Sequence, residues 1–149
     1  MAKFNFRLQG VLNIKQKLED QEKIAYGLAR AKLNEEEEKL QALIDRRDAL
    51  FSHKQSLMNG QIDFTELNIT QHAIDGNAAA IESQKKAVIR ATKAMEAAQQ
   101  RLEKAMKERK TYEKLRENAY EQFLQDMNYE EQLEINELVS FRHGNQENV

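Results

Sequence analysis

The chain has 149 residues with no proline, cysteine or tryptophan, and 32% of its residues are Asp, Glu, Lys or Arg. This composition is typical of long helices and coiled coils. The absence of cysteine excludes disulfides and thiolate metal sites, and the net charge of −2 favours neither nucleic acid nor an anionic membrane as a partner.

The beginning of the chain has no apolar run of signal-peptide length. No stretch approaches the roughly 18 apolar residues that a membrane-spanning helix needs. We therefore expect a soluble, cytosolic protein that makes no direct membrane insertion.

The first predicted element is a helix over residues 4–58. Only Gly10 and Gly27 interrupt it, and an isolated glycine costs a helix only about 1 kcal/mol relative to alanine. A turn is predicted at residues 59–63, because Asn-Gly is a strong stop signal and Gly60 suits the left-handed conformation that follows a helix.

The second predicted element is a helix over residues 64–140. Asp63 precedes Glu66 by three residues, a spacing that resembles a capping box at a helix start. Asp75-Gly76-Asn77 is a weaker turn signal within this helix. The polar residues 141–149 are predicted to form a disordered tail.

Heptad periodicity is clearest in the second helix. Its a positions are mainly apolar, and its d positions are mainly small or polar. The a series comprises Ile74, Ile81, Val88, Met95, Leu102 and Phe123, with Arg109 and Arg116 interrupting it. In the first helix the a and d positions include Leu33, Glu36, Leu40, Leu43, Leu50 and Leu57. Upstream, a register shifted by one residue is predicted from Val11, Ile14, Leu18, Ala25 and Leu28.

The two helices fit one another as an antiparallel pair. In such a pair an a residue faces a d residue, and the residue numbers of each facing pair add to a constant, here 124. The predicted layers near the turn include Leu57 with Leu67, Leu50 with Ile74, Leu43 with Ile81, and Leu33 with Ala91. The fold class is therefore all-α, a single antiparallel coiled-coil hairpin over residues 1–149.

This pairing leaves the end of the second helix without a partner. Phe4 falls opposite about residue 120, so the turns from Tyr120 to Val139 overhang. Exposed apolar residues at this density indicate a binding surface. The overhanging apolar residues are Tyr120, Phe123, Leu124, Met127, Tyr129, Leu133, Ile135, Leu138 and Val139. An alternative interpretation is that Phe4, Phe6, Phe123 and Met127 merely close the open end of the coiled coil.

No motif predicts catalysis or metal binding. A two-helix coiled coil offers no pocket that excludes water. His53 and His72 fall near the turn without the i, i+4 spacing of a helical zinc site. Residues 35–38, four consecutive glutamates, are best explained as a solvated helix face with Glu35 paired to Lys39. Arg109 and Arg116 are expected to set the register while extending their charges to solvent.

The opening of the chain resembles that of the FliJ family, small coiled-coil components of the bacterial flagellar protein-export apparatus. The distinctive segment is Phe4-Asn5-Phe6-Arg7-Leu8-Gln9-Gly10-Val11-Leu12, and the stretch Lys39-Leu40-Gln41-Ala42-Leu43 also fits. The resemblance covers essentially the whole chain in length and layout.

The resemblance implies a fold similar to the central stalk of rotary ATPases, without catalytic activity or cofactors. The terminal end would bind the hexameric export ATPase through Phe4, Phe6, Arg7, Leu8, Tyr120, Phe123, Met127 and Tyr129. A surface nearer the turn would bind the cytoplasmic domain of the export gate through Leu43, Arg46, Leu50, Ala73, Asn77 and Ala80. Export chaperones would be further partners, and the protein would associate peripherally with the membrane through the apparatus.

Two other hypotheses remain open from the residues alone. The chain could be a structural scaffold that homodimerises through the overhang. It could also be an enzyme built on a dimeric four-helix bundle, which would require a metal or a cofactor.

Overall fold

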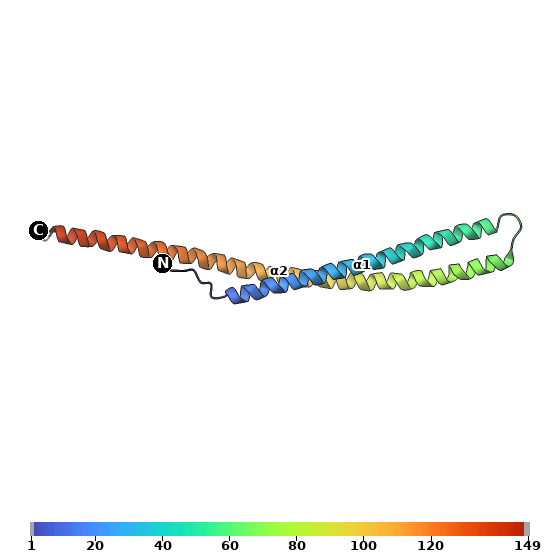
Figure 1. Cartoon of the computed structure of the whole chain (residues 1–149), viewed down its shortest axis with the longest axis horizontal. Coiled ribbons are helices and arrows are strands. Elements are labelled where there is room, and N and C mark those ends of the chain that lie inside the picture. The colour runs from blue at the N-terminus through green and yellow to red at the C-terminus, as the bar shows by residue number, and fades with distance from the viewer. Residues whose placement is uncertain (1, 148–149) are drawn as a thin grey trace. The chain divides into compact units, whose positions relative to one another are not determined.

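A computed structural model describes residues 2–147, which form two helices and no strand. Helix α1 spans Gln9–Leu57 and α2 spans Phe64–Glu147. They form an antiparallel helical hairpin, which confirms the predicted fold class (Figure 1). The contacts divide the chain into two units: unit 1 combines Met1–Glu19 with Lys104–Val149, and unit 2 is Asp20–Glu103. Each unit is described by itself.

The turn between the helices lies in unit 2 and has the predicted chemistry. Gly60 has a φ of 82°, the left-handed conformation that glycine adopts at low cost. Asp63 caps α2, because its Oδ1 accepts hydrogen bonds from the backbone N–H groups of Thr65 at 3.0 Å and Glu66 at 3.3 Å. These contacts satisfy two N–H groups that have no partner within the helix.

The helices of unit 2 pack through alternating apolar and polar layers. Leu33, Ile74 and Ile81 are buried, as are the small residues Ala91 and Ala98. These residues occupy the predicted a and d positions, so burial here agrees with the predicted register.

Cross-helix hydrogen bonds in unit 2 agree with the same pairing. The Asn77 side-chain amide donates to the Leu43 carbonyl at 3.2 Å, and Lys54 Nζ donates to Gln71 Oε1 at 2.7 Å. Each pair joins residues whose numbers add to within a few units of 124, as expected for neighbouring layers of the predicted pairing.

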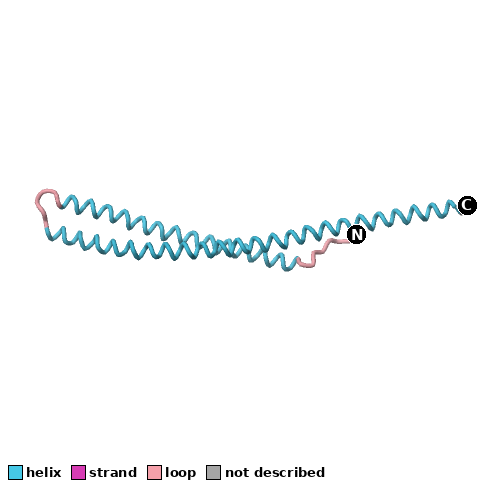
Figure 2. Tube along the Cα trace, turned by 180° about the vertical axis from the view of Figure 1, so that it is seen from behind, coloured by secondary structure: helices cyan, strands magenta, loops and turns pink. Residues whose placement is uncertain are grey.

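In unit 1, residues 2–8 are not helical, so the predicted helix start at residue 4 is wrong. We call residues 2–8 the strap (Figure 2). Its side chains alternate between exposed and covered: Lys3, Asn5 and Arg7 are exposed, while Phe4 is half-buried and Phe6 is buried. Alternation with a period of two is the signature of an extended segment that covers a surface with one face.

The predicted shift of register at the beginning of α1 is also wrong. Leu12 and Glu19 of unit 1, seven residues apart, are buried, whereas Ile14 is 64% exposed. In unit 2 the shifted register fails in the same way, because Leu28 is 68% exposed. The heptad series of Leu33 therefore continues toward the N-terminal end of α1 without interruption.

Helix α2 does not end at the predicted residue 140. Residues 141–147 continue the helix, whereas a disordered tail was expected there. The segment holds no proline, and the isolated Gly144 costs only about 1 kcal/mol. Residues 148 and 149 of the predicted tail lie outside the described residues.

Within residues 2–147, neither helix contains a window apolar enough to cross a membrane.

Candidate functional site

The strap is held on α2 by an aromatic cluster in unit 1. The Phe4 ring lies edge-on to Tyr120, with centroids 5.1 Å apart, and 5.5 Å from Phe123. Arg116 places its guanidinium carbon 5.4 Å from the Phe4 centroid and donates through Nε to Gln9 Oε1 at 2.9 Å. Ring contacts and a cation over a ring add specific attraction to apolar burial. The cluster therefore anchors the strap.

A shallow cavity of about 530 Å³ lies between the strap and α2. Apolar rings and side chains form much of its wall, and Lys3, Arg7 and Asp126 place both signs of charge at its edge. The lining residues are Lys3, Phe4, Asn5, Phe6, Arg7, Leu8, Leu115, Ala119, Gln122, Phe123 and Asp126. Its size suits one or two side chains of a protein partner.

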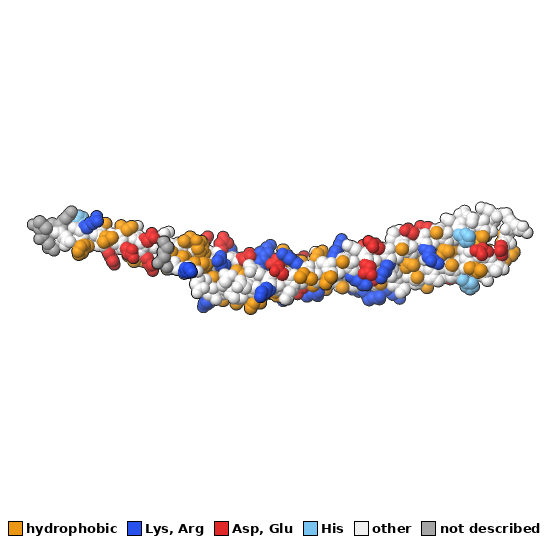
Figure 3. Space-filling model, in the orientation of Figure 1, with side chains coloured by type: hydrophobic (Ala, Val, Ile, Leu, Met, Phe, Trp, Pro, Cys, Tyr) orange, Lys and Arg blue, Asp and Glu red, His pale blue; other side chains and the backbone are white. Residues whose placement is uncertain are grey.

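Beyond the strap, α2 continues alone within unit 1. We call residues 124–145 the α2 extension. Every side chain from residue 128 to residue 145 is exposed. The exposed apolar residues of the extension are Leu124, Tyr129, Leu133, Ile135, Leu138, Val139 and Phe141. Figure 3 shows hydrophobic and acidic side chains side by side on its visible face.

The structure brings most of the predicted ATPase-binding residues together. Phe4, Phe6, Arg7, Leu8 and Phe123 line the strap cavity, and Tyr120 contacts Phe4. The expectation that Tyr120 and Phe123 have no intramolecular partner is wrong, because the strap continues past the start of α1 and places Phe4 against both rings.

The other two members of that predicted set lie farther along α2. Met127 is half-buried, and Tyr129 is 66% exposed in the α2 extension. The burial of Phe6 and the ring contacts of Phe4 and Phe123 also fit the alternative that these residues close the end of the hairpin.

The predicted gate-binding set divides between surface and interior in unit 2. Arg46 is exposed, and Leu43, Leu50, Ala73 and Ala80 are half-buried. Asn77 is only 6% exposed, with its amide donating to the Leu43 carbonyl. Asn77 therefore points into the helix interface, which its predicted d position implied.

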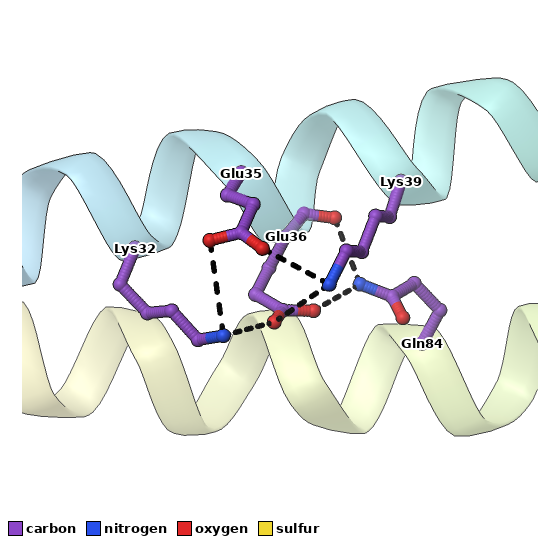
Figure 4. Close-up of polar contacts among 5 residues, drawn as sticks. All are labelled: Lys32, Glu35, Glu36, Lys39 and Gln84. Atoms are coloured by element: carbon purple, nitrogen blue, oxygen red, sulfur yellow. Dashed lines mark hydrogen bonds and ion pairs between the residues drawn. The ribbon is translucent and has the colours of Figure 1, made fainter.

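A polar layer in unit 2 centres on Glu36, the buried member of the predicted solvated glutamate run (Figure 4). Its carboxylate lies 2.9 Å from Lys32 Nζ and 3.8 Å from Lys39 Nζ, and it accepts a short hydrogen bond from Gln84 of α2. The hydrogen bonds from Lys32 and Gln84 lower the pKa of Glu36, and the bond to Glu36 raises the pKa of Lys32. The solvated-face interpretation is wrong for Glu36, although the expected Glu35–Lys39 pair is present at 3.1 Å.

A second buried carboxylate, Glu19, pairs with Arg109 in unit 1. Arg109 Nε lies 2.5 Å from Glu19 Oε2, and Arg109 Nη1 lies 2.8 Å from Glu113 Oε2. These hydrogen bonds raise the pKa of Arg109. Arg109 is thus paired across the interface, where a side chain extended to solvent was expected.

The described residues contain no group of three side chains suited to holding a metal ion. His53 Nε2 lies 3.5 Å from Glu66 Oε1 near the turn, a surface contact between the helices. The polar layers join the two helices, and their geometry fits helix pairing.

Comparison with known proteins gives one family and one solved structure. The sequence model of a family described as "Flagellar FliJ protein" matches residues 4–148. The structure of a YscO homologue, CT670, from Chlamydia trachomatis is similar with a TM-score of 0.74 and 21% identity. That likeness covers 95% of this chain and 96% of the other, and at this identity it concerns the fold. No curated protein matches the chain.

Proposed function

The chain belongs to the FliJ family, and from that premise we propose that it binds the export ATPase ring through the strap and the end of α2. Family membership makes it a component of flagellar or related type III protein export. In the proposed role it is not an enzyme: it associates with the ATPase subunits and links them to the export gate. It would act in the cytoplasm, held at the membrane only through the apparatus.

The observation that carries this proposal is the surface at the end of unit 1. The strap cavity and the adjoining exposed side chains of α2 combine aromatic anchors with charged edges. Protein interfaces derive much of their binding energy from a few such anchors. Apolar side chains exposed at this density on one helix are typical of a surface that a protein partner covers.

Titration of purified export ATPase with the full chain tests the proposal. Wild-type chain should bind, and a chain lacking residues 121–149 should not. Tyr129→Ala should weaken binding about tenfold, as loss of an aromatic anchor does. Phe64→Ala, which removes a 74% exposed ring at the start of α2, is the matched control and should leave the affinity unchanged. Absence of binding by the wild-type chain would refute the proposal.

We propose that the gate contact uses the unit 2 surface around Arg46, Ala73 and Ala80, without Asn77. Arg46 is the exposed charged member of that set, so Arg46→Glu should weaken binding to the cytoplasmic domain of the export gate while leaving ATPase binding unchanged. Equal affinity of the wild-type chain and Arg46→Glu for the gate domain would contradict this part of the proposal. Binding to export chaperones rests on family membership, and titration of a purified chaperone with the full chain tests it.

A further inference from the structure

The α2 extension changes its hydrophobic periodicity where the strap ends. Up to Phe123 the helix follows heptads, but the next a positions are Glu130 and Glu137. The earlier charged a residues, Arg109 and Arg116, are each matched by a polar side chain of α1, Glu19 and Gln9. A second copy would bring no such match to Glu130 and Glu137 from its own extension, because the extension holds no Lys or Arg before Arg142.

Four apolar residues of the extension follow another spacing, and Tyr129, Leu133, Val139 and Phe141 lie outside it. Leu124, Met127, Ile135 and Leu138 fall on one stripe, with Glu131 between them in steps of three and four residues. Over residues 124–138 this pattern is close to an 11-residue repeat, which suits a straight helix better than a left-handed supercoil. The stripe fits a groove on a globular partner, read by anchors at helical spacing.

Apart from Glu131, which lies within the stripe, the acidic residues of the extension lie along one side of it. At about 100° per residue, Asp126, Glu130 and Glu137 centre about 120° from the stripe, with Glu134 between them and it. On the other side, at a similar angle, lie the amides Gln125, Gln132 and Asn136. The stripe thus has an acid flank and an amide flank.

The acid flank has no basic side chain within its own segment. The sequence holds no Lys or Arg between Arg116 and Arg142, so no cation lies three or four residues from Asp126, Glu130 or Glu134. Asp126 also lines the strap cavity with Lys3 and Arg7, so the uncompensated carboxylates of the flank are Glu130, Glu134 and Glu137. Carboxylates of one sign repel a second copy and attract a cationic surface. They therefore decide between the possible occupants of the stripe.

We infer that the α2 extension docks into an apolar groove whose one wall is lined by Lys or Arg, and that it does not pair with a second copy of this chain. The inference rests on the proposed function for its location at the ATPase-binding end, and it specifies the chemistry of the partner. The apolar floor covers the stripe, and the basic wall faces the acid flank.

The test uses the full chain and a probe independent of the export apparatus. The probe is a labelled 18-residue synthetic helix with a leucine stripe flanked by lysines. A second probe carries glutamates in place of the lysines. Fluorescence anisotropy measures the binding of the chain to each probe. The acid-flank variant is E130Q/E134Q/E137Q. The control E37Q/E38Q/E96Q removes the same charge from exposed positions of unit 2.

Wild-type chain should bind the lysine probe, more weakly with added salt, and should not bind the glutamate probe. The acid-flank variant should bind about tenfold more weakly, and the control within about twofold of wild type. A chain ending at Met127 should lose binding. Equal weakening by both triple variants, or binding that survives the truncation, would overturn the inference.

Sedimentation of the wild-type chain supplies the competing outcome. A monomer at micromolar concentration is expected, and a dimer that disappears when the chain ends at Met127 would assign the stripe to a second copy. The ATPase titration tests the proposed function separately. If the ATPase does not bind but the chain and its variants bind the two probes as expected, the proposed function is wrong and the inferred partner chemistry is retained. If the ATPase binds with equal affinity to wild type and the acid-flank variant, only the partner chemistry falls.

Discussion

Leu33 and Leu28 are two leucines of the same helix with opposite surroundings. Leu33 is buried against α2, whereas Leu28 is 68% exposed. Burial of a leucine side chain contributes a few kcal/mol to folding, and truncation also leaves a cavity. Their contrast distinguishes the observed register from the shifted one.

Leu33→Ala should lower the free energy of unfolding by about 2–4 kcal/mol, because it removes packed methyl groups from the interface. Leu28→Ala should change it by less than about 0.5 kcal/mol. Urea denaturation followed by circular dichroism measures both. Similar losses for the two variants would restore the shifted register.

The Glu36 layer predicts a dependence of stability on pH. Because the folded-state pKa of Glu36 is lowered, its contribution is present above its unfolded pKa of about 4.3 and is lost as the pH falls through the folded value. The Tm advantage of wild type over Glu36→Gln should therefore be present at pH 7 and shrink in acid. Thermal melts of both proteins between pH 7 and pH 3 measure it.

Glu37→Gln is the control for that series, since Glu37 is exposed on the same turn. Its Tm difference from wild type should stay nearly constant over the same range. The raised pKa of Lys32 acts at the other end, because its contribution is full below the unfolded pKa of about 10.4 and is lost as the pH rises through the folded value. An unchanged Glu36→Gln difference in acid would contradict the assigned role of the layer.

At the scale of elements, the sequence predicts the helix pairing near the turn well, but it predicts the register of the N-terminal part of α1 poorly. Ile74, Ile81 and Leu33 are apolar at heptad spacing, so pattern alone places them in the interface. Farther along α1 the interface includes Glu19, a charged residue that a hydrophobic pattern assigns to solvent. Its burial depends on Arg109, 90 residues away, which periodicity does not detect.

The structures of the strap and of the end of α2 differ from the prediction for other reasons. The alternation of Lys3, Phe4, Asn5, Phe6 and Arg7 is a period-two signal for an extended segment, and good helix formers downstream obscured it. At the other end, polar composition suggested a tail, although nothing there stops a helix. The strap cavity follows from the extended strap, and five of its eleven lining residues belong to the predicted binding set, whereas its shape was not predicted.

The turn offers a test with an internal control. Gly60→Ala should destabilise the hairpin by about 1 kcal/mol, because alanine is strained at a φ of 82°. Gly76→Ala should stabilise it by about 0.5–1 kcal/mol, because Gly76 lies inside α2 and an added Cβ would meet nothing within 4 Å. Urea titrations compare the two. Equal effects would mean that the turn conformation does not limit stability.

At the scale of the whole molecule, protection should differ along α2. Side chains from residue 128 to residue 145 are all exposed, and a helix without tertiary packing is marginal in water. Hydrogen–deuterium exchange with mass spectrometry should show amides of 128–145 exchanging at least about tenfold faster than those around Ile74 and Ile81. Equal protection would indicate that something covers the extension in the free protein, and a bound partner should slow exchange there.

The antiparallel pairing also predicts the order in which contacts between the helices form during folding. Lys54 and Gln71, beside the turn, are 17 residues apart in the chain, while Gln9 and Arg116 are separated by 107. Closing a longer loop costs more entropy, although the cost grows slowly with length. Folding is therefore expected to begin at the turn and close the pair progressively. On a ribosome the strap would be made before α2 and yet dock among the last, since its partners on α2 are synthesised more than 100 residues later.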